Sequence, residues 1–247
     1  MTGTSHHPHE DEPPTDSPTD APAEAPSGVP PEAPAEIPAE APALEPLSAL
    51  LTETDGRLPD PLLDELTDLY ASNAEFFALS GDFPDPYALR RDEVASSLNA
   101  ELAHPAAEVL LAREPGRATT PASGRVTTPG SGDRPPGRLT GLAATLTEHP
   151  DPIDPYPWIG LLLIHGDLHR SGHGSRLAAC VEDRLRASGH DGVRLAVLDN
   201  NPGALVFWTA LGYRAIDHRT DHAMGRPCTV LHKDLSTGPD KAKAGRP

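Results

Sequence analysis

The chain has 247 residues, of which 30 are prolines and 4% are aromatic, and it carries a formal net charge of −17 at pH 7. Nine of its 37 acidic residues lie within residues 1–43, so the remainder of the chain is only mildly acidic. This charge argues against binding to nucleic acid, whose phosphate backbone requires a basic surface. No apolar run approaches the roughly 20 residues that a membrane span needs.

Residues 1–43 form a segment rich in proline, alanine and glutamate, without lysine, arginine or aromatic residues. Prolines remove backbone donors, and no apolar periodicity offsets the entropy of ordering, so we expect a disordered acidic tail. A second disordered tail is expected over 237–247. The N-terminus lacks the basic and apolar regions of a secretory signal. Cys180 and Cys228 indicate neither a disulfide framework nor a metal site, so we expect a cytoplasmic protein without bound metal.

A folded domain is expected over 44–236. Its first part predicts a strand or turn near Leu44–Leu51, helices over about 62–77 and 89–102, and a strand over 108–113. Residues 115–137 form a second low-complexity stretch, rich in proline, glycine, serine, threonine and arginine. A stretch of this length with so little to bury is expected to be a hairpin insertion into the domain.

The second part of the domain alternates between strand and helix patterns. Strands are predicted over 138–146, 158–164, 193–197, 213–217 and 229–233, with helices over 175–188 and from Asn201 to Gly212. Asn201 is a favoured N-cap, and proline at the next position is tolerated because that amide has no helical partner. This alternation predicts an α/β fold with a mixed sheet.

A strand followed by a glycine turn is the most informative local pattern. The apolar run Leu161–Ile164 leads into His-Arg-Ser-Gly-His-Gly-Ser at 169–175, which opens a predicted helix. Backbone amides at such a turn converge, and the helix dipole adds positive potential, so the pattern predicts a site for a pyrophosphate. Gly172 and Gly174 would let the anion approach the backbone. No Gly-Lys-Ser/Thr follows, which excludes a P-loop.

One helix and one strand later stands a second motif, formed by Asn201, Ala204, Trp208, Gly212 and Tyr213. Over residues 137–235 the two motifs together resemble the GCN5-related N-acetyltransferase (GNAT) family in order and spacing. The resemblance implies a GNAT fold, with a mixed, mostly antiparallel central sheet flanked by helices. It also implies an acetyl-CoA-dependent enzyme that moves an acetyl group to a primary amine of a small molecule or peptide, by direct attack on the thioester.

The resemblance also implies contacts to acetyl-CoA, residue by residue. The backbone of Leu162, Leu163 and Ile164 would pair with the pantetheine arm, and Asn201 would contact the pantetheine or thioester region. The pyrophosphate would be wrapped by Arg170, Ser171, Gly172, His173, Gly174 and Ser175. The first two helices would shape the acceptor site, which makes Tyr70, Phe76, Phe77 and Tyr87 candidate acceptor contacts, with packing in the core as the alternative for each.

The chain departs from the family at the positions of its acid and bases. Trp208 stands where a tyrosine often protonates the departing thiolate, and an indole is not a usable acid. Ala196 and Trp158 stand where members of the family carry glutamate bases, and His169 replaces the usual glutamine or arginine. The catalytic residues are therefore not predicted. A non-catalytic acyl-CoA-binding or sensing module of the same fold stays open as the alternative, and a homodimer is one of the assemblies that the sequence allows.

Overall fold

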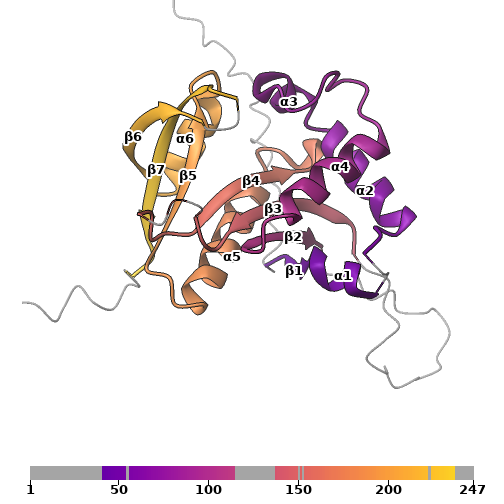
Figure 1. Ribbon diagram of the computed structural model, residues 1–247, viewed down its shortest axis with the longest axis horizontal. Helices are drawn as coiled ribbons and strands as arrows, with labels where there is room; N and C mark the ends of the chain where they lie inside the picture. Colours follow the sequence, from indigo (N-terminus) through magenta and orange to yellow (C-terminus); the bar gives the residue numbers. More distant parts are fainter. Residues whose placement is uncertain are drawn as a thin grey trace, which may run out of the picture. The chain divides into compact units, whose positions relative to one another are not determined.

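The computed structural model describes residues 41–53, 56–114, 137–149, 151, 153–221 and 224–236 (Figure 1). Apart from residues 41–43 and Gly137, the expected N-terminal tail and the expected insertion lie outside the described residues, as does the expected C-terminal tail. Within the described part of the chain, no helix is both long and apolar enough to cross a membrane.

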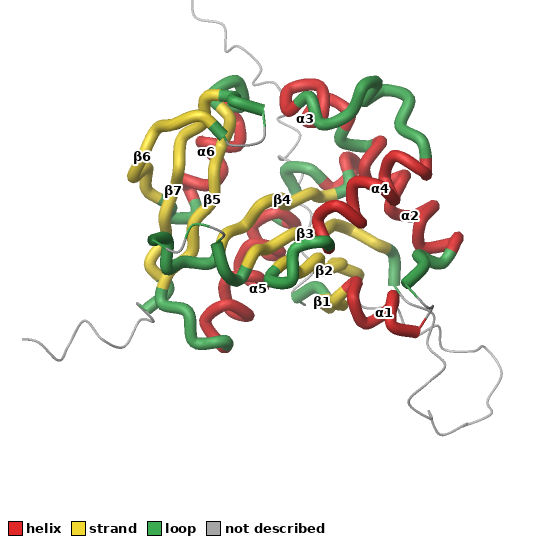
Figure 2. The backbone as a smooth tube through the Cα atoms, viewed as in Figure 1, coloured by secondary structure: helices red, strands yellow, loops and turns green. Residues whose placement is uncertain are grey.

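Seven strands form one sheet in the order β1-β2-β3-β4-β5-β7-β6 (Figure 2). The strands are β1 Ala43–Pro46, β2 Ala107–Arg113, β3 Leu139–Leu146, β4 Trp158–Ile164, β5 Gly192–Leu198, β6 Arg214–Thr220 and β7 Pro227–Asp234. All neighbouring strands are antiparallel except β4 and β5, which are parallel. The mixed, mostly antiparallel sheet expected from the sequence is therefore confirmed.

Helices pack on both faces of this sheet. They are α1 Leu47–Glu53, α2 Asp60–Ala71, α3 Ala74–Ser80, α4 Arg91–Leu102, α5 His173–Ala187 and α6 Pro202–Ala210, with a short 3-10 turn, η1, at Gly166–Leu168. Side chains alternate between the two faces along a strand. Leu142 on β3 thus belongs to the core under α1–α4, whereas its neighbour Ala143 belongs to the core under α5 and α6.

The helix expected over 62–77 is interrupted, and this prediction was wrong in its middle. α2 ends at Ala71 and α3 begins at Ala74. The Ser72 hydroxyl and the Asn73 side-chain amide both donate to the Leu69 carbonyl, at 2.7 and 2.8 Å. Such side-chain bonds compete with the helical backbone ladder. The segment 44–51 also differs, because it forms both β1 and the start of α1.

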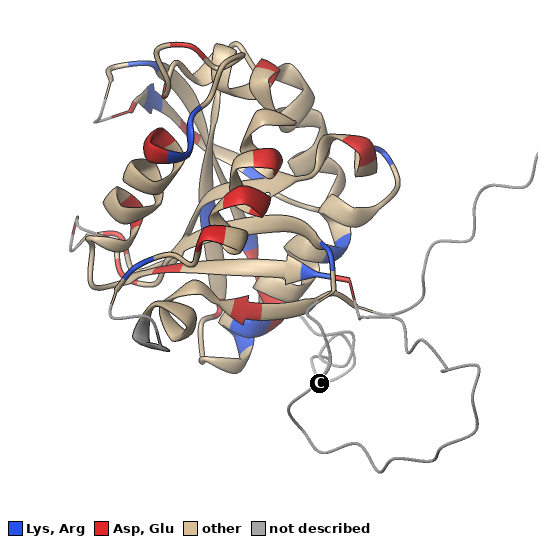
Figure 3. Cartoon of the chain, turned by 90° about the vertical axis from the view of Figure 1, so that its right-hand side faces the viewer, with Lys and Arg blue, Asp and Glu red and all other residues tan. Residues whose placement is uncertain are grey.

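Charged residues of both signs are interspersed over the described helices and strands (Figure 3). The edge strand β6 is exposed along almost its whole length, and it carries Arg214, Asp217, His218 and Arg219. Charges on an edge strand disfavour pairing with another sheet.

The packing of β3 against β4 leads to a first prediction. A Cβ atom at Gly141 would lie 2.6 Å from the Leu163 carbonyl oxygen and 2.7 Å from Ile164 Cδ1. Gly141→Ala should therefore lower the free energy of unfolding in urea by about 1–3 kcal/mol, because backbone must move to admit the methyl group. As a control, Gly160→Ala on β4 should change it by less than about 0.5 kcal/mol, since the nearest atom there lies at 3.8 Å. Equal stability of the two variants would contradict this packing.

Candidate functional site

The parallel strands β4 and β5 separate soon after they begin. They pair only at Trp158 with Arg194 and at Ile159 with Leu195. β5 continues along β7 as far as Leu198, and β4 continues along β3 as far as Ile164, so each strand stays extended on its other side. Beyond these two pairs, the backbone amides and carbonyls on the facing edges of β4 and β5 do not pair with each other. An extended ligand can pair with such a strand edge.

This opening belongs to a cleft of about 1530 Å³, whose walls include residues 159–164 of β4 and 195–198 of β5. One arm of the cleft extends to the start of α5 and to α6, and the other is bounded by α2, α3, α4 and the loop after α3. Gly160 is an extra residue in β4, because the pairing with β3 shifts between Ala144 and Thr145. A bulge of this kind changes the direction in which the neighbouring backbone groups point.

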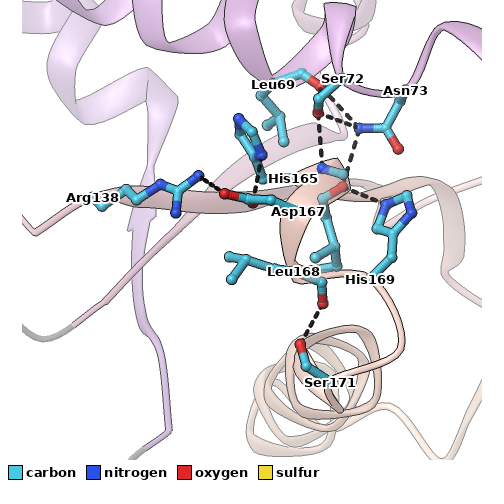
Figure 4. Close-up of polar contacts among 11 residues, drawn as sticks. Leu69, Ser72, Asn73, Arg138, His165, Asp167, Leu168, His169 and Ser171 are labelled. Carbon is cyan, nitrogen blue, oxygen red and sulfur yellow. Dashed lines mark hydrogen bonds and ion pairs between the residues drawn. The ribbon is translucent and has the colours of Figure 1, made fainter.

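The end of β4 is fixed by the break between α2 and α3 (Figure 4). The Ile164 carbonyl accepts hydrogen bonds from Asn73 Nδ2 at 3.0 Å and from His169 Nε2 at 2.8 Å. The Gly166 amide donates to the Ser72 hydroxyl at 3.0 Å. A Cβ at Gly166 would lie only 2.7 Å from the Ser72 carbonyl oxygen, so this approach requires glycine. The same side chains that interrupt the helix therefore hold the strand.

A small charged cluster lies beside this strand end (Figure 4). Asp167 contacts Arg138 Nη2 at 2.6 Å and His165 Nδ1 at 2.7 Å. The hydrogen bond from Arg138 holds the pKa of the Asp167 carboxyl below its usual range. His169 occupies the position at which the sequence suggested a contact to a phosphate, but its Nε2 is engaged with the strand.

The glycine turn leads directly into α5. Arg170 has a φ of 60° and Gly172 a φ of 81°, and the helix begins at His173 with Gly172 as its N-cap. Amides in the first turn of an α-helix have no partner within the helix, and the dipole favours an anion there. Burial and the charge of Arg176 lower the pKa of His173. This helix start therefore has the properties of an anion site.

Most of the residues expected to contact acetyl-CoA line this one cleft, and their assignment to that ligand stays a prediction. The lining ones are Leu162, Leu163, Ile164, Arg170, Gly172, Gly174, Ser175 and Asn201. Ser171 and His173 do not line it, and the Ser171 hydroxyl donates to the Leu168 carbonyl instead. Asn201 caps α6, because its Oδ1 accepts from the Ala204 amide at 3.1 Å.

The positions of the family's acid and bases offer no accessible titratable group. Trp208 is buried and packs edge-on against Tyr213, with ring centroids 5.0 Å apart. The Tyr213 phenol lies in the core, where burial and the nearby Glu182 carboxylate raise its pKa. Ala196 lines the cleft but carries no proton acceptor, and Trp158 Nε1 donates to Asp154 at 3.0 Å.

The arm of the cleft bounded by α2, α3 and α4 is partly aromatic, and the contact of its aromatic residues with an acceptor stays a prediction. Tyr70, Phe76 and Phe77 line it, and Phe83 packs edge-on against Phe77, with ring centroids 4.9 Å apart. The expectation for Tyr87 was wrong, because its side chain is 72% exposed and lies outside the cleft. It sits in the irregular segment before α4.

Sequence reasoning missed the charged residues of this arm. Asp82, Glu93, Glu101, Asp221 and Arg226 all line the cleft. Burial, together with the charge of Asp82, raises the pKa of Glu101. One signal was available, because Glu101 follows the buried Val94 and Leu98 at helical spacing and so continues an apolar stripe with a carboxylate. The approach of Asp221 and Arg226 to α3 depends on tertiary structure alone.

Comparisons with known proteins relate part of the chain to a described family. Residues 152–221, which contain β4, α5, β5, α6 and β6, match the family model described as FR47-like protein, a GNAT-related family. The matched segment contains both sequence motifs and the opening between β4 and β5. The match supports the resemblance to the GNAT family that the motifs indicate, and the mixed seven-stranded sheet with flanking helices matches the GNAT fold.

Solved structures of similar architecture include acetyltransferases from several bacteria. One is a putative GNAT acetyltransferase from Desulfovibrio desulfuricans, with 12% identity and a TM-score of 0.48, covering 79% of this chain and 99% of that chain. An acetyltransferase from Thermus thermophilus has 18% identity and a TM-score of 0.47, over 70% and 90%. The ribosomal-protein-S18-alanine N-acetyltransferase from Escherichia coli has 13% identity and a TM-score of 0.47, over 81% and 97%. A search of curated proteins found no match.

The anchoring of β4 leads to a second prediction. Asn73 is 7% exposed and donates to the carbonyls of Leu69 and Ile164. Asn73→Ala should therefore lower the free energy of unfolding by about 1–3 kcal/mol, the cost of removing one partner from buried hydrogen bonds. Asn99→Ala, at an exposed position of α4, is the matched control and should be nearly neutral. Urea denaturation measures both, and equal effects would show that Asn73 does not anchor the strand.

Proposed function

We propose that the protein is an acetyl-CoA-dependent N-acetyltransferase that acts on a primary amine of a small molecule or peptide. The observation that carries this proposal is the free edge of β4, which is followed, after the short turn η1, by a glycine turn at the start of α5. The strand edge suits the amide groups of pantetheine, and the helix start suits a pyrophosphate. Both features lie in one cleft of about 1530 Å³.

The chain's own residues fit this ligand along the cleft. Backbone amides around Gly172–Ser175 would bind the pyrophosphate, with Gly172 supplying a left-handed conformation that side chains rarely adopt. The edge of Leu162–Ile164 would pair with the pantetheine arm, which would run from the turn back along β4. That direction leads to the bulge at Gly160. A backbone amide near the bulge would then polarise the thioester carbonyl.

Acetyl-CoA, when bound, supplies an activated acetyl group that an amine can attack without a covalent enzyme intermediate. The acceptor would enter through the arm formed by α2, α3 and α4, where Tyr70, Phe76 and Phe77 provide apolar walls. The protein's task there is to hold the nitrogen near the carbonyl carbon, to exclude water and to take up a proton.

A non-catalytic acyl-CoA-binding module is the second candidate. It is favoured by one observation: Trp208, which lines the cleft, carries an indole and not an acid, and the Tyr213 phenol is buried in the core. Turnover of any amine by the wild-type protein would exclude this alternative.

A charge placed at the start of α5 provides the third prediction. Ser175 is exposed and lines the cleft in the first turn of the helix. Ser175→Glu should weaken acetyl-CoA binding by more than about tenfold, because the carboxylate repels the pyrophosphate. The same charge interacts favourably with the helix dipole, by about 0.3–1 kcal/mol, so stability should not fall. Calorimetric titration with acetyl-CoA measures the affinity, and thermal unfolding measures the stability.

The control for this prediction is Ala179→Glu, which adds the same charge at an exposed position one turn further along α5, outside the cleft. Its affinity for acetyl-CoA should match that of the wild type. If Ser175→Glu also bound acetyl-CoA with wild-type affinity, the helix start would not be the pyrophosphate site.

A further inference from the structure

One helix supplies most of the polar groups in the acceptor arm. α4 places Val94 and Leu98 in the core and turns the adjoining side and its C-terminal end toward the cleft. The residues on this side and end are Glu93, Ser96, Ser97, Ala100 and Glu101. The helix therefore has both an apolar contact with the sheet and a polar contact with the cleft.

Four carboxylates line this arm, and three of them have partners. Arg226 contacts Asp82 at 3.1 Å and Asp221 at 2.5 Å. Glu93 accepts a hydrogen bond from the Arg90 amide at 3.0 Å. Glu101 has no hydrogen bond and no ion pair with any residue that the structure describes. It is thus the one carboxylate of the four whose charge is not balanced by a neighbour.

Glu101 also lies close to the expected position of the thioester. A second hollow, of about 330 Å³, is lined by Glu101, His104, His149, Trp158 and the bulge residue Gly160. Glu101 and Gly160 line the main cleft as well. The two residues therefore belong to the same part of the wall, where the acceptor arm meets β4.

The surroundings of Glu101 favour a cation. The Tyr70 side chain is 1% exposed and lines the cleft, and its hydroxyl interacts with the Ser97 side chain on α4. Burial and then the charge of Glu101 raise the pKa of this phenol, so Tyr70 stays neutral. A buried hydroxyl and an unbalanced carboxylate both gain from a ligand with N–H groups.

We propose that Glu101 binds the acceptor as its ammonium ion and takes a proton from it. This inference rests on the proposed acetyl transfer and names its base and its acceptor class. The acceptor class is a primary amine on an apolar stem, with the ammonium at Glu101 and the stem against Phe76 and Phe77.

The proton and electron balance of this step is simple. An N–H bond of the ammonium breaks and an O–H bond forms on Glu101, which frees the nitrogen lone pair. The nitrogen then forms a bond to the acetyl carbon, and the C–S bond breaks with its electron pair on sulfur. The second nitrogen proton neutralises the thiolate. Glu101 then returns its proton to solvent through the cleft, to which its side chain is exposed.

The acid–base properties of Glu101 are consistent with this role. Its pKa lies above the usual value of about 4.3, because the surrounding protein disfavours the charge and because Asp82 adds repulsion. The other titratable groups around it are Tyr70 on α2, Glu93 on α4, and His104 and His149 at the second hollow. Below its pKa Glu101 is protonated and cannot accept a proton, so activity is lost as pH falls through that value. A raised pKa brings a base closer to the pKa of its substrate.

The test compares Glu101→Gln with the wild type over a range of pH, using acetyl-CoA with 2-phenylethylamine or hexylamine and measuring thiol release. At pH 7, kcat/KM of the variant should fall by about 10²-fold or more, the usual contribution of a general base. The variant can use only the neutral amine, so its kcat/KM should rise about tenfold per pH unit while that of the wild type is level. The deficit should therefore shrink as pH rises.

Controls separate the outcomes. Glu101→Gln should keep the melting temperature and the acetyl-CoA affinity of the wild type, and Asp92→Asn, on the exposed face of the same helix, should keep full activity. A deficit that is the same at every pH, or the lack of any deficit, would overturn the role of Glu101 while leaving acetyl transfer intact. Binding of acetyl-CoA without turnover of either amine would overturn the acceptor class. Failure to bind acetyl-CoA at all would overturn the proposed function itself.

Discussion

The cleft depends on the small number of backbone hydrogen bonds between β4 and β5. Buried amides and carbonyls need partners, and a sheet normally supplies them along its whole width. Here only two residue pairs join the two strands. Each strand is kept extended by its other neighbour, β3 or β7, so the sheet can open without losing either strand. The opening is therefore built into the fold, and it creates the edge on which a ligand can pair.

Helices lie at both arms of the cleft, and two of them hold the end of β4. α5 follows β4 after the 3-10 turn η1 and the glycine turn, and its N-terminus lies at one end of the cleft. The break between α2 and α3 holds the same strand end through Ser72 and Asn73. At the acceptor arm, α4 brings Glu101 near Gly160. Contacts among a few short segments thus hold the strand end and both arms of the cleft in place.

Much of the core was predictable from the sequence, because its elements are marked by sequence patterns within a few neighbouring residues. Trp158–Ile164 is an apolar run bounded by turn residues, and Asn201-Pro202 is a strong helix start, so both elements were located correctly. The interruption at Ser72–Asn73 was not predicted, because the apolar periodicity continues through it. The local bonds of these two side chains to the Leu69 carbonyl act together with their tertiary bonds to Ile164 and Gly166, which the sequence does not reveal. Glu101 was missed for a similar reason. A carboxylate at the end of an apolar stripe is significant only when the cleft beside it is known.

The central claim, that the free edge of β4 and the start of α5 form one acyl-CoA site, is tested most directly by amide hydrogen exchange with and without acetyl-CoA. Saturating acetyl-CoA should slow exchange at Gly160–Ile164 and at Gly172–Ser175, because these amides gain partners on the ligand. It should leave the exposed edge strand β6 unchanged. Protection confined to other segments, or uniform protection across the chain, would contradict the account.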